Sequence, residues 1–412
     1  MAGSATITYA DYGSFDKVGN RGSKNTPAGA ETYGYDPVYR LIQAATPGGT
    51  EKFTYDLVGN RLSGPGPKET KYLYDAGNRM LVGRVFGYLY DNNGNQVGRT
   101  LPVVTDKSWV QIWDAENRLI RVEKVKGATE YRTVAFKYDP QGRRIEKKLM
   151  SLVNGITKNS SRLYFYDNDN IALEMYTDET GAVKKSWYTH GADIDEHLAV
   201  ERDGAHYFYH ADGLGSVTAI TDSGRNVVQS YAYESFGMLR PSTDFMDSYT
   251  YTGREWDREA GLYYYRARYY DPRDGRFILK DPIGFKGGDI VLYSYTRNNP
   301  VNNVDPSGLG PIGRACGSGW SEFFVPDSIF GWYSFHSPCQ NHDSCYDNCV
   351  KTKEQCDSEF LRDTLNICNS LLPGGYWKNH CEGSAYFYYS TVRNSSYAEK
   401  AFIETHKCKC GK

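Results

Sequence analysis

Cysteine is missing from the first three quarters of this 412-residue chain. All nine cysteines lie between Cys316 and Cys410, after the segment 297–310, which is rich in Asn, Pro and Gly. Small domains that are dense in cysteine usually rely on disulfides to compensate for a small hydrophobic core. The shift in composition therefore predicts two parts built under different rules, with a junction at about Leu309.

The chain also lacks an excess of either charge and any long apolar run. Its net charge is -2 at pH 7, so no electrostatic attraction to nucleic acid or to another acidic polymer is indicated. It contains no run of 18 apolar residues, which argues against a spanning helix. Residues 1–10 show no basic region followed by an apolar core. Because the C-terminal cysteines are expected to be oxidised, we expect export by a signal-independent route, or a chain that is the tail of a longer one.

Tyrosine is unusually frequent, with 36 Tyr against 17 Phe. Many tyrosines stand in a recurring phrase: an aromatic residue, Asp, a short spacer that often carries Gly-Asn, then Arg and an apolar residue. The aspartates of this phrase recur 16 to 28 residues apart, at Asp16, Asp36, Asp56, Asp75, Asp91, Asp114, Asp139 and Asp167. Such a period predicts stacked units rather than one globular core. We expect each unit to be a β-hairpin, because its flanks alternate and Gly-Asn suits positive-φ turn positions.

From about residue 205 the repeat gives way to other phrases, such as Tyr-Phe-Tyr-His-Ala-Asp-Gly-Leu-Gly-Ser at 207–216 and Gly-Leu-Tyr-Tyr-Tyr-Arg-Ala-Arg-Tyr-Tyr-Asp-Pro at 261–272. The repeats resemble the YD-repeat, or Rhs, family, and the later phrases resemble its Rhs-associated core. The resemblance covers about residues 1–310 and implies a mainly β shell of spiralling β-hairpins. It assigns YD/Rhs repeats to 1–204 and the Rhs-associated core to 205–309. An ordinary antiparallel β-domain with coincidental Tyr-Asp pairs is the alternative.

Two Asp-Pro-x-Gly phrases end this core and begin at Asp281 and Asp305. Alone, such a phrase is typical of a simple turn. The resemblance implies instead that the pair cuts its own chain after the Leu of the second phrase. Two adjacent carboxylates can share one proton, which leaves one as a base to activate water and the other as an acid. Carried over, Asp281 and Asp305 would cleave between Leu309 and Gly310. His210 we interpret as structural.

The chemistry expected of the C-terminal part lies in the motif Ser-Pro-Cys-Gln-Asn-His-Asp-Ser-Cys-Tyr-Asp-Asn-Cys at 337–349. Proline suits the first turn of a helix, on which His342 and Cys345 would share one face. Zinc ligation is one interpretation, although no Cys-x-x-Cys pair accompanies it. A cysteine nucleophile is another, and it suits a disulfide-rich domain poorly. A second, amphipathic helix is expected over 356–368.

Upstream, the glycine-rich turn at 315–320 could direct carbonyl oxygens at a cation, and hard oxygen ligands with one carboxylate suit calcium. Together these motifs resemble secreted phospholipase A2, closest to its group-twelve branch, over about residues 314–372. The resemblance implies a small disulfide-rich α-helical domain over 310–412. It also implies that a His takes a proton from the water that attacks the sn-2 ester, while Ca²⁺ stabilises the oxyanion. The product is a free fatty acid, such as arachidonic acid.

Residue by residue, the resemblance makes His342 the catalytic base and Asp357 the residue that orients it, with Asp363 as the alternative. It assigns the calcium site to one carboxylate and three carbonyl groups, those of Asp343, Ala315, Gly317 and Gly319. It suggests the disulfides Cys316–Cys339 and Cys345–Cys356. One departure from the family pattern supports this assignment of residues. The family has one further disulfide, and the two positions that would form it are Pro338 and Asp363 here, so both of its cysteines are missing together.

We therefore predict a bacterial, secreted Rhs-type toxin whose β-shell carries a calcium-dependent phospholipase A2 that acts at target-cell membranes. Membrane phospholipid is the expected substrate. An immunity protein and a secretion-system adaptor are candidate partners, and nucleic acid is not expected. The alternative is a non-catalytic cell-surface adhesion or receptor-binding protein with an inert phospholipase scaffold. A third interpretation is that the repeats act alone as a carbohydrate-binding surface. The aromatic residues between 320 and 335 suit either an acyl-chain slot or an ordinary core.

Overall fold

The computed structural model describes the following residues: 10–65, 71–101, 107–126, 130–191, 194–240, 248–311, 328–329, 333–334 and 352–371. The chain divides into two compact units, Met1–Pro311 and Ile312–Lys412. The predicted boundaries after residues 204 and 309 stay predictions. Within the described ranges, no helix combines the length and the apolar composition that a membrane crossing requires.

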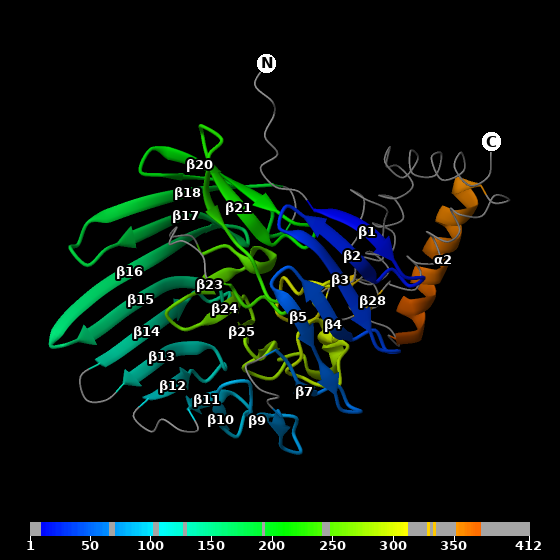
Figure 1. The fold of residues 1–412 in the computed structure, drawn as a ribbon, viewed down its shortest axis with the longest axis horizontal. Coiled ribbons are helices and arrows are strands. Elements are labelled where there is room, and N and C mark those ends of the chain that lie inside the picture. The colour runs from blue at the N-terminus through cyan, green and yellow to red at the C-terminus, as the bar shows by residue number, and fades with distance from the viewer. Residues whose placement is uncertain are drawn as a thin grey trace. The chain divides into compact units, whose positions relative to one another are not determined.

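The first unit begins with a five-stranded antiparallel sheet in sequence order (Figure 1). Its strands are β1 (Asp11–Phe15), β2 (Arg21–Thr26), β3 (Gly29–Tyr35), β4 (Leu41–Thr46) and β5 (Gly49–Lys52). A separate hairpin follows, formed by β6 (Thr54–Tyr55) and β7 (Arg61–Ser63). The mainly β shell expected from the sequence is confirmed for this unit.

A 15-stranded sheet follows, in which each strand pairs with its sequence neighbour from β8 to β22. Its first strands are β8 (Leu73–Tyr74), β9 (Met80–Val82), β10 (Gly87–Tyr90), β11 (Gln96–Thr100), β12 (Lys107–Trp113), β13 (Leu119–Lys126), β14 (Glu130–Tyr138) and β15 (Arg144–Val153). The others are β16 (Ile156–Asp167), β17 (Asn170–Thr177), β18 (Val183–His190), β19 (His197–Arg202), β20 (Ala205–Ala211), β21 (Val217–Asp222) and β22 (Val227–Ser230). Figure 1 shows β12 to β18 side by side. The sheet continues past residue 205, so the change of sequence phrase occurs inside one sheet.

The recurring aspartate closes the hairpin turn in seven of its eight copies, and the exception is Asp167, which pairs with Asn170 at the end of β16. In the turn at Asp56, carboxylate Oδ1 accepts the backbone N–H groups of Val58 at 3.1 Å and Asn60 at 2.7 Å. The Asp56 N–H donates to the Asn60 carbonyl at 2.9 Å, and Gly59 lies between them with φ of 103°. Three-residue hairpin loops need such a left-handed residue, which explains the Gly or Asn at this place. The predicted hairpins are therefore built by Asp at the start of the turn in all of these copies except the one at Asp167.

The tyrosine before the aspartate ties its unit to the preceding one in several of the repeats. The Tyr55 hydroxyl donates to the Leu41 carbonyl at 2.7 Å, and the Tyr138 hydroxyl donates to the Leu119 carbonyl at 2.6 Å. The same contact recurs through the hydroxyls of Tyr35, Tyr74 and Tyr166, and through that of Tyr233, which precedes Glu234 instead of an aspartate. A phenylalanine would fill the space but leave these buried carbonyls without that donor, which accounts for the excess of tyrosine.

A four-stranded sheet supports the site described below. Its strands are β23 (Glu255–Asp257), β24 (Leu262–Tyr265), β25 (Arg268–Asp271) and β26 (Arg276–Phe277). Both faces are buried, as alternation along a strand allows. Leu262 and Tyr264 pack with Val122 and Val134 of the large sheet, while Tyr263 faces a second aromatic cluster. Three 3₁₀ turns flank it: η1 (Tyr251–Gly253), η2 (Gly284–Gly287) and η3 (Thr296–Asn298).

In the second unit the structure describes β27 (Ser328–Ile329), β28 (Tyr333–Ser334) and the helix α2 (Lys353–Leu371). The helix predicted over 356–368 is thus present and extends beyond both predicted ends. Its buried face carries Cys356, Phe360, Thr364 and Cys368, which are spaced by four residues. This spacing is the amphipathic stripe expected from the sequence.

Candidate active site

Local turns place both aspartates of the Asp-Pro-x-Gly phrases. Asp281 follows β26, and its Oδ1 accepts the Ile283 N–H at 3.0 Å, while its carbonyl accepts the Gly284 N–H at 2.9 Å. Asp305 follows η3, and its Oδ1 accepts the N–H groups of Leu309 and Gly310, both at 3.1 Å. The turn interpretation is therefore correct for both phrases. In the second phrase the same turn also brings the Asp305 carboxylate to the N–H of the Leu309–Gly310 peptide bond.

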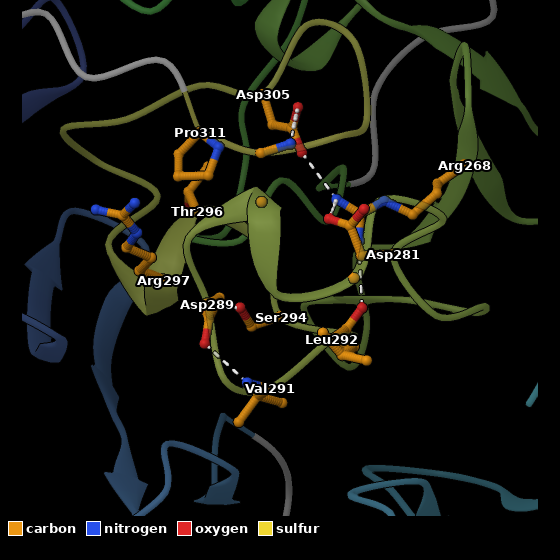
Figure 2. A pocket seen from close by; sticks show the side chains of 13 residues that line it. Arg268, Asp281, Asp289, Val291, Leu292, Ser294, Thr296, Arg297, Asp305 and Pro311 are labelled. Carbon is orange, nitrogen blue, oxygen red and sulfur yellow. Dashed lines mark hydrogen bonds and ion pairs between the residues drawn. The ribbon is translucent and has the colours of Figure 1, made fainter. Parts of the chain in front are cut away.

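Arg268, from β25, joins the two aspartates. Its guanidinium Nη2 lies 3.1 Å from Asp281 Oδ2 and 3.2 Å from Asp305 Oδ2. Figure 2 shows this guanidinium between the two carboxylates. The same group donates to the carbonyls of Leu292 and Gly308, and it lies over the Phe277 ring. A planar fork with several donors suits this arrangement, which a lysine could not reproduce.

Burial makes both carboxylates weaker acids than usual. It raises the pKa of Asp281 to about 6, against the opposing charge of Arg268. It also raises the pKa of Asp305, again against Arg268 and against the backbone N–H groups that Asp305 accepts. Each N–H donated to a carboxylate favours its ionised form. Asp305 Oδ1 accepts two such N–H groups and Asp281 accepts one, so we place a shared proton on Asp281 and the charge on Asp305.

A pocket of about 260 Å³ opens at this pair, and its enclosed part has room for about one water molecule. Its lining includes Asp281, Asp305, Arg268, Gly287 and Gly310 (Figure 2). The site thus combines two carboxylates, a counter-ion, space for a water and a peptide bond held by a hydrogen bond. This set can hydrolyse that bond by acid–base catalysis.

The structure brings together all four residues that the sequence assigned to self-cleavage, and it adds two that sequence reasoning missed. In the sequence, Arg268 is one of two arginines in the phrase at 261–272, and nothing in that phrase marks it as the one that reaches the aspartates. Gly287 carried no signal of its own beyond the Gly-Gly pair at 287–288. His210 stands apart from this site on β20, and its Nε2 lies 2.9 Å from the Thr221 hydroxyl.

Of the residues assigned to phospholipase chemistry, the structure describes Asp357 and Cys356. Asp357 is 1% exposed on α2, and its Oδ2 accepts a hydrogen bond from Lys353 at 2.7 Å. Asp363, the alternative, lies farther along α2 beside Arg362. Cys356 is disulfide-bonded. The other assigned residues lie outside the described ranges: His342, Asp343, Ala315, Gly317, Gly319, Cys316, Cys339 and Cys345.

Cys368 is disulfide-bonded as well. Twelve residues along a helix correspond to about 18 Å, which is far beyond the reach of one disulfide. Cys356 and Cys368 therefore do not bond to each other. The predicted calcium site has no described ligand, and in the part of the chain that the structure describes no cluster of His, Cys, Asp and Glu is suited to a metal. Calcium stays a prediction from the sequence.

Comparison with known proteins identifies the family of the first unit. Residues 8–301 match the family model described as Teneurin YD-shell. The tRNA3(Ser)-specific nuclease WapA of Bacillus spizizenii is 39% identical over 226 residues, which are 53% of this chain and 9% of that protein. The double-stranded DNA deaminase toxin A of Burkholderia cenocepacia is 30% identical over 309 residues, which are 68% of this chain and 21% of that protein.

The chain also shows a likeness to solved structures. The Photorhabdus luminescens Tc holotoxin pore matches with a TM-score of 0.43 at 17% identity, over 76% of this chain and 19% of that one. This chain thus spans less than a quarter of each of these three proteins.

Proposed function

The chain belongs to the teneurin YD-shell family, and from this premise we propose that its first unit is the carrier of an Rhs-type toxin, which cuts its own backbone between Leu309 and Gly310. The names of two relatives, a nuclease and a deaminase toxin, support the assignment to toxins. The observation that carries the proposed cut is the hydrogen bond from the Gly310 N–H to Asp305 Oδ1, because it places a carboxylate on the leaving nitrogen.

The proposed reaction uses one proton on Asp281 and one charge on Asp305. A water in the pocket gives a proton to Asp305 as its oxygen attacks the Leu309 carbonyl carbon. Asp281 donates its proton to the carbonyl oxygen, and Arg268 holds both carboxylates in place. The C–N bond then breaks, Asp305 passes its proton to the Gly310 nitrogen, and Asp281 regains a proton from the hydroxyl that becomes the carboxyl group. The products are a C-terminal Leu309 and an N-terminal Gly310.

The size of the purified chain tests this proposal. Intact mass analysis of the wild type is expected to show two fragments that end at Leu309 and begin at Gly310. Asp281→Asn and Asp305→Asn are each expected to leave one uncut chain, because each removes one of the two proton carriers. Asp289→Asn is the matched control, since Asp289 also lines the pocket, but its carboxylate accepts hydrogen bonds from Val291 and Ser294 and, among the described residues, forms no ion pair with Arg268. An uncut wild type, or an Asp305→Asn chain that still cuts, contradicts the proposal.

For the second unit we propose a calcium-dependent phospholipase A2, which is released by the cut and acts on membrane phospholipid after export. The support is the His-Asp motif at 342–343 together with α2, on which Asp357 is buried as an orienting carboxylate would be. The relatives carry the names of other activities, so lipid hydrolysis rests on the sequence motifs. His342 would act as the base and Asp343 would bind Ca²⁺, which supplies the charge that stabilises the oxyanion.

Fatty-acid release from phospholipid vesicles tests this second proposal. The full chain is expected to release fatty acid with Ca²⁺ and to stop when a chelator is added or when His342 is replaced by Ala. Asp357→Asn is expected to reduce release strongly, while Glu354→Gln, which neutralises an exposed carboxylate on the same helix, is the matched control. If the folded, oxidised protein releases no fatty acid, the non-catalytic binding module becomes the better interpretation of this unit.

A further inference from the structure

The backbone at Gly287, the last residue of η2, lies against the peptide bond that the proposed function cuts. A Cβ atom added to Gly287 would lie 2.6 Å from Asp281 Oδ2 and 2.9 Å from the Leu309 carbonyl oxygen. Both distances are shorter than ordinary contacts of a carbon atom with an oxygen. The absence of a side chain at Gly287 therefore leaves open the space where the acid and the carbonyl oxygen approach each other.

The other end of the same peptide bond also rests on Gly287. A Cβ atom added to Gly310 would lie 3.0 Å from the Gly287 carbonyl oxygen and 3.4 Å from its Cα. Gly287 and Gly310 both line the pocket at the aspartate pair. The Gly287 backbone thus borders the Leu309 carbonyl on one side and the Gly310 Cα on the other.

Backbone conformation does not require glycine at position 287. Its φ lies outside the left-handed region, unlike the φ angles of 62° at Gly284 and 79° at Gly288 on either side. An alanine there is compatible with the turn, and only the contacts of its methyl group oppose it. The need for glycine therefore comes from the site rather than from the fold.

We infer that Gly287 is a positioning residue of the self-cleavage site, whose missing side chain lets the Asp281 carboxyl group reach the Leu309 carbonyl oxygen. This inference rests on the proposed self-cleavage. A methyl group at Gly287 would displace the carboxyl group, the carbonyl or both. A displacement of about 1 Å at a reacting group can cost about a hundredfold in rate.

The test measures how fast the newly translated chain is converted to its two fragments. The chain is pulse-labelled in a cell-free translation reaction, chased at a fixed pH, and analysed on gels for the first-order appearance of fragments. Gly287→Ala is expected to cut about a hundredfold more slowly than the wild type at an unchanged thermal midpoint. Gly34→Ala is the matched control: it is the same change in β3, where the nearest atom to the added Cβ is 3.8 Å away, and we expect it to cut normally.

The pH profile separates positioning from a general loss of structure. Moving the Asp281 carboxyl group away from Arg268 weakens the attraction that lowers its pKa, so residual cutting by Gly287→Ala should extend to higher pH. Gly310→Ala presses on the Gly287 carbonyl from the substrate side and also strains residue 310 itself, whose φ is 150°, so it is expected to slow cutting as well.

Wild-type rates in Gly287→Ala or in Gly310→Ala overturn the inference. A lowered thermal midpoint in Gly287→Ala, or slow cutting with an unshifted pH profile, overturns it too, because a fold defect then explains the loss. If instead the wild type does not cut and Asp281→Asn changes nothing, it is the proposed self-cleavage itself that has failed.

Discussion

Removing the charge of Arg268 is expected to slow self-cleavage and to move it to higher pH. The guanidinium lies 3.1 and 3.2 Å from oxygens of the two buried carboxylates. At an effective dielectric constant of about 20, one such attraction is worth about 4 kcal/mol at 4 Å, which corresponds to about 3 in pKa. In Arg268→Met, the pKa of each aspartate therefore rises, and at neutral pH both carboxyl groups carry a proton.

A doubly protonated pair contains no base, so the rate at pH 7 should fall at least about tenfold, since a pKa one unit above the pH leaves about a tenth of the base ionised. Raising the pH restores the ionised base and part of the rate. Protonation also limits the cost to stability, because neither carboxyl group is left charged and buried. Arg268→Lys retains the charge but not the fork that contacts both aspartates and the Gly308 carbonyl, so we expect an intermediate rate.

The assay is the pulse-chase measurement of fragment formation between pH 5 and 9, with thermal unfolding of each variant measured in parallel. An Arg268→Met chain that cuts at the wild-type rate, with the wild-type pH profile, refutes the reasoning. So does a variant that stays folded but gains no activity at higher pH, because the loss would then not come from a change in protonation.

Three further outcomes are expected. Tyr55→Phe should lower the free energy of unfolding by about 1 kcal/mol in urea titrations, because it removes a buried hydrogen bond, whereas Tyr39→Phe at an exposed site should have no effect. Equal values for the two variants would count against a stabilising role for the hydrogen bonds from tyrosine hydroxyls to the carbonyls of the preceding unit. Because the pKa of Asp281 is raised to about 6, the folded state binds more protons than the unfolded state between about pH 4 and 6, so this group's contribution to stability falls as the pH rises through that window. An uncut Asp281→Asn chain should lack this fall in stability. A fall of the same size in both proteins would show that other groups cause it. Reduction should lower the free energy of unfolding of the second unit by about 2–4 kcal/mol for each disulfide at Cys356 and Cys368, and it should leave the calorimetric transition of the cysteine-free first unit unchanged. A shift in the transitions of both units would contradict the assignment of the disulfides to the second unit.

Local sequence determined the repeating part of this fold. An aspartate at the start of the turn, a left-handed residue that is Gly or Asn in all but the Asp36 turn, and alternating flanks specify a hairpin from within a few residues. The stripe on α2 specified a helix in the same way, although its ends lay outside the predicted range because turns at helix ends depend on neighbouring residues. These features were predictable because the interactions that form them are local.

Tertiary structure decided the chemistry of the site. The two Asp-Pro-x-Gly phrases are turns by their sequence, and only the packing of β25 beneath them sets Arg268 between the carboxylates. The raised pKa of Asp281 depends on burial, which no short phrase encodes. The role inferred for Gly287 depends on a contact with residues 309 and 310, more than twenty positions away, so the sequence supplied the reacting groups and the folded chain alone supplied the distances between them.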